Sequence, residues 1–170
     1  FGRALAVLAL CYLGNFLGGL LLAVAIRFST LLNGPTGELV DQAVAHKLSF
    51  LQNGAAGVGD LFVRAILCNL MINIAMLIVY NGVAKSDGVK VIAMVVSVLL
   101  FAFLGFEHSV ANTVLFTVEA LQNGIDIWPA LGNLGVALVG NYIGGGLLIG
   151  LYYAYANDEK HHRRTHPKIA

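Results

Sequence analysis

Charged residues are scarce in this sequence. Of its 170 residues, 11% are Asp, Glu, Lys or Arg and 58% are hydrophobic, and the mean hydropathy is +0.81. A soluble domain carries about a quarter charged residues and is about half apolar, so this composition excludes an ordinary soluble domain. We expect an all-α integral membrane protein. The net charge of +1 supplies no broad positive field and argues against a nucleic-acid partner.

Cysteines are also few, and metal-binding patterns are lacking. Cys11 and Cys68 both lie inside apolar segments, and we interpret them as buried small apolar residues rather than a disulfide or a redox pair. No Cys/His spacing typical of a metal site is present, so we expect neither a metal nor another cofactor. The sequence has no initiating Met and no visible signal peptide, and an apolar segment begins almost at once, which is typical of a start in mid-protein.

Four apolar blocks predict the membrane spans. Three are uninterrupted, at 4–26, 65–84 and 129–156, and each can cross a hydrocarbon core of ~30 Å, which needs about 20 helical residues. The fourth, 91–118, is interrupted near 105–108, and we expect a broken helix that crosses the membrane once. Residues 1–157 would then form one transmembrane domain, followed by a basic tail at 158–170.

The distribution of Lys and Arg predicts the orientation. The tail carries four basic residues and therefore belongs in the cytoplasm. Counting spans back from this end places seven basic residues inside and three outside, the latter being Arg27, Lys47 and Arg64. We expect the tail to contact anionic lipid rather than nucleic acid or metal.

Two of the blocks share a motif. LGNFLGG at 13–19 is similar to VGNYIGG at 139–145, and the predicted orientation makes the two segments run in opposite directions. This is typical of an inverted-topology repeat. The repeat predicts two further helices before Phe1, the second of them broken. The GxxxG pairs in these segments, including Gly14 with Gly18, predict close helix packing.

The interrupted block keeps two adjacent ionisable residues, Glu107 and His108, in an apolar environment. A charge at the centre of a membrane helix costs about 2.5–3.5 kcal/mol, so such groups face a protein interior or a wet cavity. Neighbouring residues on a helix point about 100° apart, so one of the two should face a pore and the other support the break. Phe101 and Asn112 lie seven residues before and four after His108, which predicts a shared pore face.

Glu107 is then expected to hold backbone N–H groups or neighbouring polar side chains, such as Asn69 or Asn73. The structural alternative is that Glu107 and His108 only connect helices.

Several stretches together resemble the formate/nitrite transporter family: AHK at 45–47, ILCNLM at 66–71, GFEHSVAN at 105–112 and GNYIGGGLL at 140–148. The resemblance covers the chain up to its tail. It implies a homopentamer in the cell membrane whose aquaporin-like protomers each have six helices. It also implies a pore in each protomer for small monovalent anions, nitrite or formate, or their conjugate acids. The stretch after Asn112, TVLFTVEAL, is more similar to the nitrite-type members than to the formate-type ones, and formate, hydrosulfide and lactate or acetate remain open as substrates.

The resemblance implies a role for each candidate residue. His108 would be the central pore histidine, by which a proton accompanies the anion, and Phe101 would lie in the adjacent hydrophobic constriction. Lys47 would attract anions in the vestibule, and the polar support would come from Glu107, Asn69 and Asn112.

The competing interpretation is a membrane-embedded structural or redox subunit that uses the Glu-His pair. A bis-histidine haem needs two histidines within spans, and only His108 lies in a predicted span. Ser109 is adjacent to His108 and badly oriented for a serine hydrolase. We therefore expect a transporter and not an enzyme.

Overall fold

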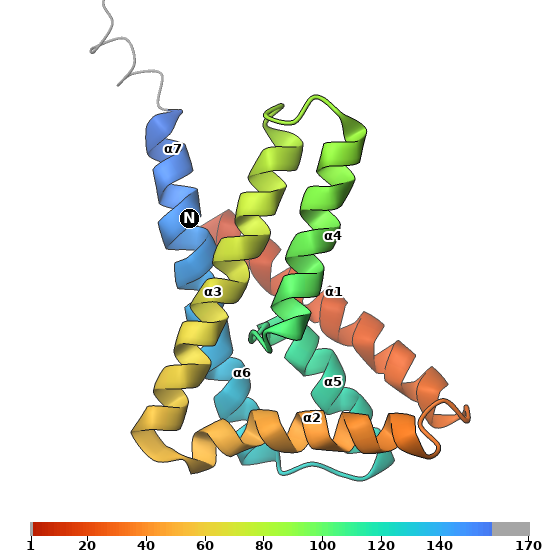
Figure 1. The fold of residues 1–170 in the computed structure, drawn as a ribbon. Coiled ribbons are helices and arrows are strands. Elements are labelled where there is room, and N and C mark those ends of the chain that lie inside the picture. Colours follow the sequence, from red (N-terminus) through yellow and green to blue (C-terminus); the bar gives the residue numbers. More distant parts are fainter. Residues whose placement is uncertain (1, 158–170) are drawn as a thin grey trace, which may run out of the picture. The chain divides into compact units, whose positions relative to one another are not determined.

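The structure is a computed structural model that describes residues 2–157, and the predicted basic tail at 158–170 lies outside these residues. The described residues form helices joined by turns, with no strand among them. In chain order the helices are α1 (Gly2–Arg27), α2 (Pro35–Gln52), α3 (Gly54–Tyr80), α4 (Asp87–Phe103), α5 (Ser109–Gln122), α6 (Ile127–Asn141), the wider π-helix η1 (Tyr142–Leu151) and α7 (Tyr152–Ala156) (Figure 1).

The chain forms two compact units. The first contains the described residues up to Phe62 together with Glu107–Leu138, and the second contains Val63–Phe106 together with the described residues from Val139 onward. Helices α3 and α6 each contribute to both units, and the change from one unit to the other after Phe106 falls between α4 and α5.

Three helical segments of the described chain are long and apolar enough to cross a membrane: α1, α3 and the continuous segment Ile127–Ala156. They overlap the three uninterrupted spans expected from the sequence. Helix α3 begins at Gly54, whereas the apolar block expected from the sequence begins only at residue 65, because Asp60 and Arg64 interrupt the apolar run before it. Helix α4 ends at Phe103 and α5 begins at Ser109, so the segment around GFEH is not helical.

The first unit contains a helix, α2, between the first two expected spans, where no helix was predicted from the sequence. Its apolar residues Val40, Val44 and Leu48 recur every four positions and so share one face. That face packs in the apolar cluster with Phe116 of α5 and Ala130 of α6. The polar residues between them hide this pattern in a search for membrane spans.

Helix α1 lies against α5 in the same unit (Figure 1). Gly19 makes the close approach possible, since a Cβ atom there would lie 2.7 Å from Cγ2 of Val114. The hydroxyl groups of Tyr12 and Thr113 are hydrogen-bonded at 2.6 Å. Most apolar side chains of α1 are exposed, which suits a helix that contacts lipid or further protein.

In the second unit, α3 packs against the start of η1. Gly144 lies against the backbone of α3, where any Cβ would clash with the carbonyl oxygen of Ile66. Two amides fix this contact: Asn69 Nδ2 donates to the Asn141 carbonyl at 2.9 Å, and Asn141 Nδ2 donates to the Ala65 carbonyl at 2.9 Å. The lack of a side chain at Gly144 and the two amide hydrogen bonds together define this helix pair.

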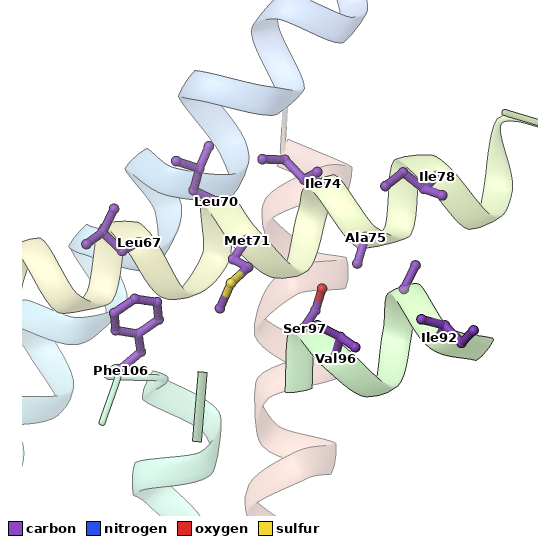
Figure 2. A pocket seen from close by; sticks show the side chains of 11 residues that line it. Leu67, Leu70, Met71, Ile74, Ala75, Ile78, Ile92, Val96, Ser97 and Phe106 are labelled. Atoms are coloured by element: carbon purple, nitrogen blue, oxygen red, sulfur yellow. The ribbon is translucent and has the colours of Figure 1, made fainter. Parts of the chain in front are cut away.

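Helices α3 and α4 leave a cavity of about 410 Å³ between them, with Phe106 at one end (Figure 2). Its lining is almost wholly aliphatic, and Ser97 is the one lining residue with a hydroxyl group. An anion gains nothing from such walls and would lose its hydration, so this cavity is not an anion site.

Candidate functional site

The interruption between α4 and α5 begins with a defined helix end. The Gly105 N–H donates to the Ala102 carbonyl at 3.2 Å, and the Phe106 N–H donates to the Phe101 carbonyl at 3.0 Å. This pair of bonds is a Schellman motif, which needs a residue in the left-handed region at its turn. Gly105 supplies it with φ of 63°. The glycine of GFEH therefore stops α4 before the ionisable pair.

Arg64 of α3 satisfies the last carbonyl groups of α4. Its Nη1 donates to the carbonyls of Leu104 and Gly105 at 3.1 and 3.2 Å. The last four carbonyls of a helix have no partner within it, and the C-terminal end of the helix dipole favours a cation. Arg64 thus stabilises the end of α4 in both ways.

His108 begins α5. Its backbone is extended, with φ −117° and ψ 115°, and its Nδ1 accepts a hydrogen bond from the Ala111 N–H at 3.4 Å. An Nδ1 that accepts this bond carries no proton, so the neutral ring has its N–H at Nε2. The first N–H groups of α5 and its dipole also favour negative charge near His108.

Glu107 is 1% exposed and forms an ion pair with Lys47 of α2, whose Nζ lies 2.8 Å from Oε1. Its other oxygen, Oε2, accepts a hydrogen bond from the side-chain amide of Asn112. Both oxygens of the buried carboxylate therefore have partners, as its burial requires.

Asn133 of α6 completes the network and was not among the residues predicted from the sequence. Its Oδ1 accepts from Asn112 Nδ2 at 2.9 Å, and its Nδ2 donates to the carbonyl of Lys47 at 3.0 Å. The bonds thus run from Lys47 through Glu107, Asn112 and Asn133 back to Lys47, and they connect α2, the interruption, α5 and α6. The available signal was an Asn within an apolar span, and Asn133 is 0% exposed.

Three of the candidates, Lys47, Glu107 and Asn112, therefore lie in one network in the first unit, and Glu107 precedes His108 in the chain. Glu107 was expected to meet neighbouring amides, and its ionic partner here is Lys47. Phe101 and Asn69 belong to the second unit, where Phe101 contributes to the end of α4 and Asn69 binds the Asn141 carbonyl. Among residues 2–157, no group of three or more His, Cys, Asp or Glu is arranged to hold a metal ion.

Comparison with known proteins gives the family. Residues 1–155 match the model of the formate/nitrite transporter family. The chain belongs to the formate/nitrite transporter family. It is 32% identical over 176 residues to the formate channel FocA of Escherichia coli K12, covering 89% of this chain and 59% of FocA. It is 29% identical over 161 residues to the nitrite transporter NirC of the same strain, covering 93% of this chain and 57% of NirC.

A third relative, the formate channel FocA of Haemophilus influenzae, is 30% identical over 85% of this chain and 56% of its own length. The chain thus spans less than two thirds of the length of these relatives. The named relatives are channels and a transporter, and the predicted family is confirmed.

Proposed function

We propose that the protein transports small monovalent anions, nitrite or formate, across the cell membrane through a pore in each protomer. The observation that carries this proposal is the position of His108. In a chain of this family, the histidine begins α5 at a helix interruption beside a buried carboxylate that is paired with a lysine. FocA and NirC have similar identity to this chain, so identity does not separate formate from nitrite.

His108 is the proposed anion-binding group. Its Nε2–H can donate to an oxygen of nitrite or formate, since Nδ1 is engaged with Ala111. The N-terminal dipole of α5 adds a partial positive charge at the same place. Together they replace part of the hydration that an anion loses in a narrow apolar pore.

Lys47 has two proposed effects on the anion. It neutralises Glu107, which would otherwise repel an anion approaching His108 in an environment of low dielectric constant. Its remaining field draws anions toward the vestibule, and this attraction is modest because the ammonium is already paired. Asn112 supports the same carboxylate, and Asn69 supports the neighbouring helix pair.

The constriction that we assign to Phe101 favours a neutral species. A bare anion would lose its hydration there without compensation. His108 first takes up a second proton from the solution on the side from which the anion came. The resulting imidazolium gives one proton to the anion oxygen and returns to the neutral ring, and the conjugate acid, which has no net charge, can cross. We propose that a proton accompanies the anion in this way.

The proposed architecture has α4 and α5 crossing the membrane together as one broken helix, with the C-terminus in the cytoplasm. An aquaporin-like inverted repeat and a homopentamer complete the proposal. Several features support it: the distribution of Lys and Arg, the repeated Gly-Asn motif, and the open face of α1 at Gly14 and Gly18, where a Cβ would meet nothing within 4 Å.

Transport by the purified protein in liposomes tests the proposal. We expect rapid uptake of nitrite and formate relative to empty liposomes. We expect no uptake of sulfate, because this larger divalent anion still carries a negative charge after it binds one proton. Equal rates for all three anions, or rates no faster than in empty liposomes, would show that the protein is not a selective pore for small monovalent anions.

A further inference from the structure

Glu119, in the last turn of α5 and just beyond the predicted span at 91–118, is an unusual carboxylate. It is only 8% exposed. Its Oε1 lies 3.3 Å from the amide nitrogen of Asn123, whereas its Oε2 is buried and has no hydrogen-bond partner. A buried polar atom without a partner is rare and costly, and for an ionised carboxylate it is costlier still.

The same amide also binds Asp41 of α2. Asn123 Nδ2 donates to Oδ1 of Asp41 at 2.9 Å, so the two hydrogens of one amide serve two carboxyl groups. Asp41 and Glu119 line a cavity of about 210 Å³, together with Glu38. All residues that line this cavity are described, and none of them is Lys, Arg or His. Three acidic groups thus meet there without a basic side chain in the lining.

We propose that Asp41 and Glu119 form a proton-binding site that holds one proton between their two carboxyl groups. The proton bonds to Oε2 of Glu119, and the resulting hydroxyl donates to the carboxylate of Asp41. Two negative charges become one, and the buried Oε2 gains the partner that it lacks. Neighbouring carboxyl groups bind a shared proton for this reason.

The electrostatics of Glu119 agree with this arrangement. Burial raises the pKa of Glu119 above its ordinary value; the hydrogen bond from Asn123 opposes this shift, and the nearby Asp41 carboxyl adds to it. The other carboxylate that lines the cavity, Glu38, is exposed on α2 and adds further negative charge. The proton is thus held more tightly than by an isolated glutamate.

The proton would act on the packing of α2 against α5. Successive turns of α2 carry three contacts: Asp41 with Glu119 through Asn123, Val44 with Phe116 in the apolar cluster, and Lys47 with Glu107. Proton binding strengthens the first contact. A lower pH therefore strengthens the packing of α2 against α5 at the Asp41 end of their interface, and a higher pH weakens it.

A carboxyl pKa raised by folding has a definite effect on stability. The stabilisation is fully present below the pKa of the unfolded chain and is lost as the pH rises through the pKa of the folded protein. We therefore expect the thermal unfolding midpoint of the detergent-solubilised protein to fall as the pH rises from acidic toward neutral.

Matched amide variants test the site. Glu119→Gln places a permanent N–H donor opposite Asp41 and imitates the protonated pair. We expect it to unfold a few degrees above the wild type at neutral pH and to lose most of the pH dependence in the acidic range. Glu38→Gln removes a carboxylate that lines the same cavity but does not share the amide, so it should keep the wild-type pH dependence. The proposal is wrong if Glu119→Gln keeps the wild-type dependence of the unfolding midpoint on pH, or if only Glu38→Gln loses this dependence.

Infrared difference spectroscopy reads the proton directly and does not depend on unfolding. We expect the wild-type protein to keep the carbonyl band of a protonated carboxylic acid above the pH at which ordinary Asp and Glu ionise, about 3.9 and 4.3. Glu119→Gln and Asp41→Asn should each remove this band, whereas Glu38→Gln should retain it. Absence of the band in the wild type would refute a shared proton, whatever the outcome of the transport assays.

Discussion

The ammonium nitrogen of Lys47 lies 2.8 Å from Oε1 of Glu107, and the glutamate is almost fully buried. The two residues are 60 positions apart in the chain. Their ion pair connects α2 to the point where the chain enters α5. A buried ion pair contributes little net stability over an apolar pair, but removing one partner leaves an uncompensated charge. The structure of the interruption therefore depends on keeping both residues or neither.

Lys47→Met should destabilise the protein by about 3–5 kcal/mol, because Glu107 is left buried without its cation. Adding Glu107→Gln should recover most of that loss, since no charge then remains to be buried. Thermal or denaturant unfolding in detergent measures both differences.

Lys90→Met provides the control for this comparison. Lys90 pairs with Asp87 at 2.9 Å, but the Asp87 side chain is 92% exposed. We expect the free energy of unfolding to change by no more than about 1 kcal/mol, as for other exposed ion pairs. A loss for Lys47→Met no larger than for Lys90→Met would mean that water reaches Glu107 in the native protein.

The sequence predicted the long apolar helices more readily than the contacts between side chains. Composition alone identifies α1 and α3, because a membrane span is a property of consecutive residues. Helix α2 was not predicted, because its apolar residues occur only at every fourth position and do not form a continuous apolar run. In the structure this apolar face packs against α5 and α6. The pairing of Lys47 with Glu107 could not be predicted from a single sequence, because nothing local specifies a partner 60 residues away.

Asn133 shows the same limit for a single side chain. An Asn in an apolar span suggests a hydrogen-bonding role, but the sequence contains several such residues, including Asn69 and Asn141. The structure separates them: Asn133 joins the network of Glu107, whereas the other two bind backbone carbonyls of the second unit. Residue type indicates that a partner is needed, and only the packing of the helices determines which one.

Gly105→Ala should lower the free energy of unfolding by about 1–2 kcal/mol. The backbone at this position has φ of 63°, and a residue with a Cβ atom is strained in this left-handed region. Gly88→Ala is the matched control in the first turn of the same helix, where φ is not positive and the added Cβ would lie 3.6 Å from Ser86 Oγ. That substitution should be neutral or slightly stabilising, since Ala favours helix over Gly by up to about 1 kcal/mol. Thermal unfolding compares the two, and equal effects would show that the Schellman turn can rearrange.

Gly144→Ala should loosen the contact of η1 with α3, because the added methyl group meets the carbonyl oxygen of Ile66, and backbone cannot move aside as a side chain can. We expect a loss of about 1–3 kcal/mol, typical of overpacking. Gly135→Ala, in α6, adds the same group where nothing lies within 4 Å and should be tolerated. A loss of stability in both variants would point to glycine flexibility rather than to close packing.

His108→Phe and His108→Asn separate the three properties of the central histidine: its Nε2–H donor, its titratable proton, and its role at the start of α5. His108→Phe removes all three and leaves an apolar side chain. His108→Asn loses the titratable proton but retains an N–H donor, and Asn is among the best residues for beginning a helix. Thermal unfolding checks that both proteins fold, and a loss of about 1 kcal/mol in His108→Phe alone is expected from the lost cap.

Transport in liposomes then distinguishes the roles. His108→Phe should abolish nitrite and formate uptake, because the anion meets no donor beside the break. His108→Asn should still conduct anions, but its current should no longer vary between about pH 5 and 8, the range in which histidine changes charge, and an enclosed dye should report no acidification. If His108→Phe, once shown to fold, retains wild-type rates with wild-type pH dependence, His108 has a structural role and does not bind the anion. The proton that accompanies the anion must then come from water.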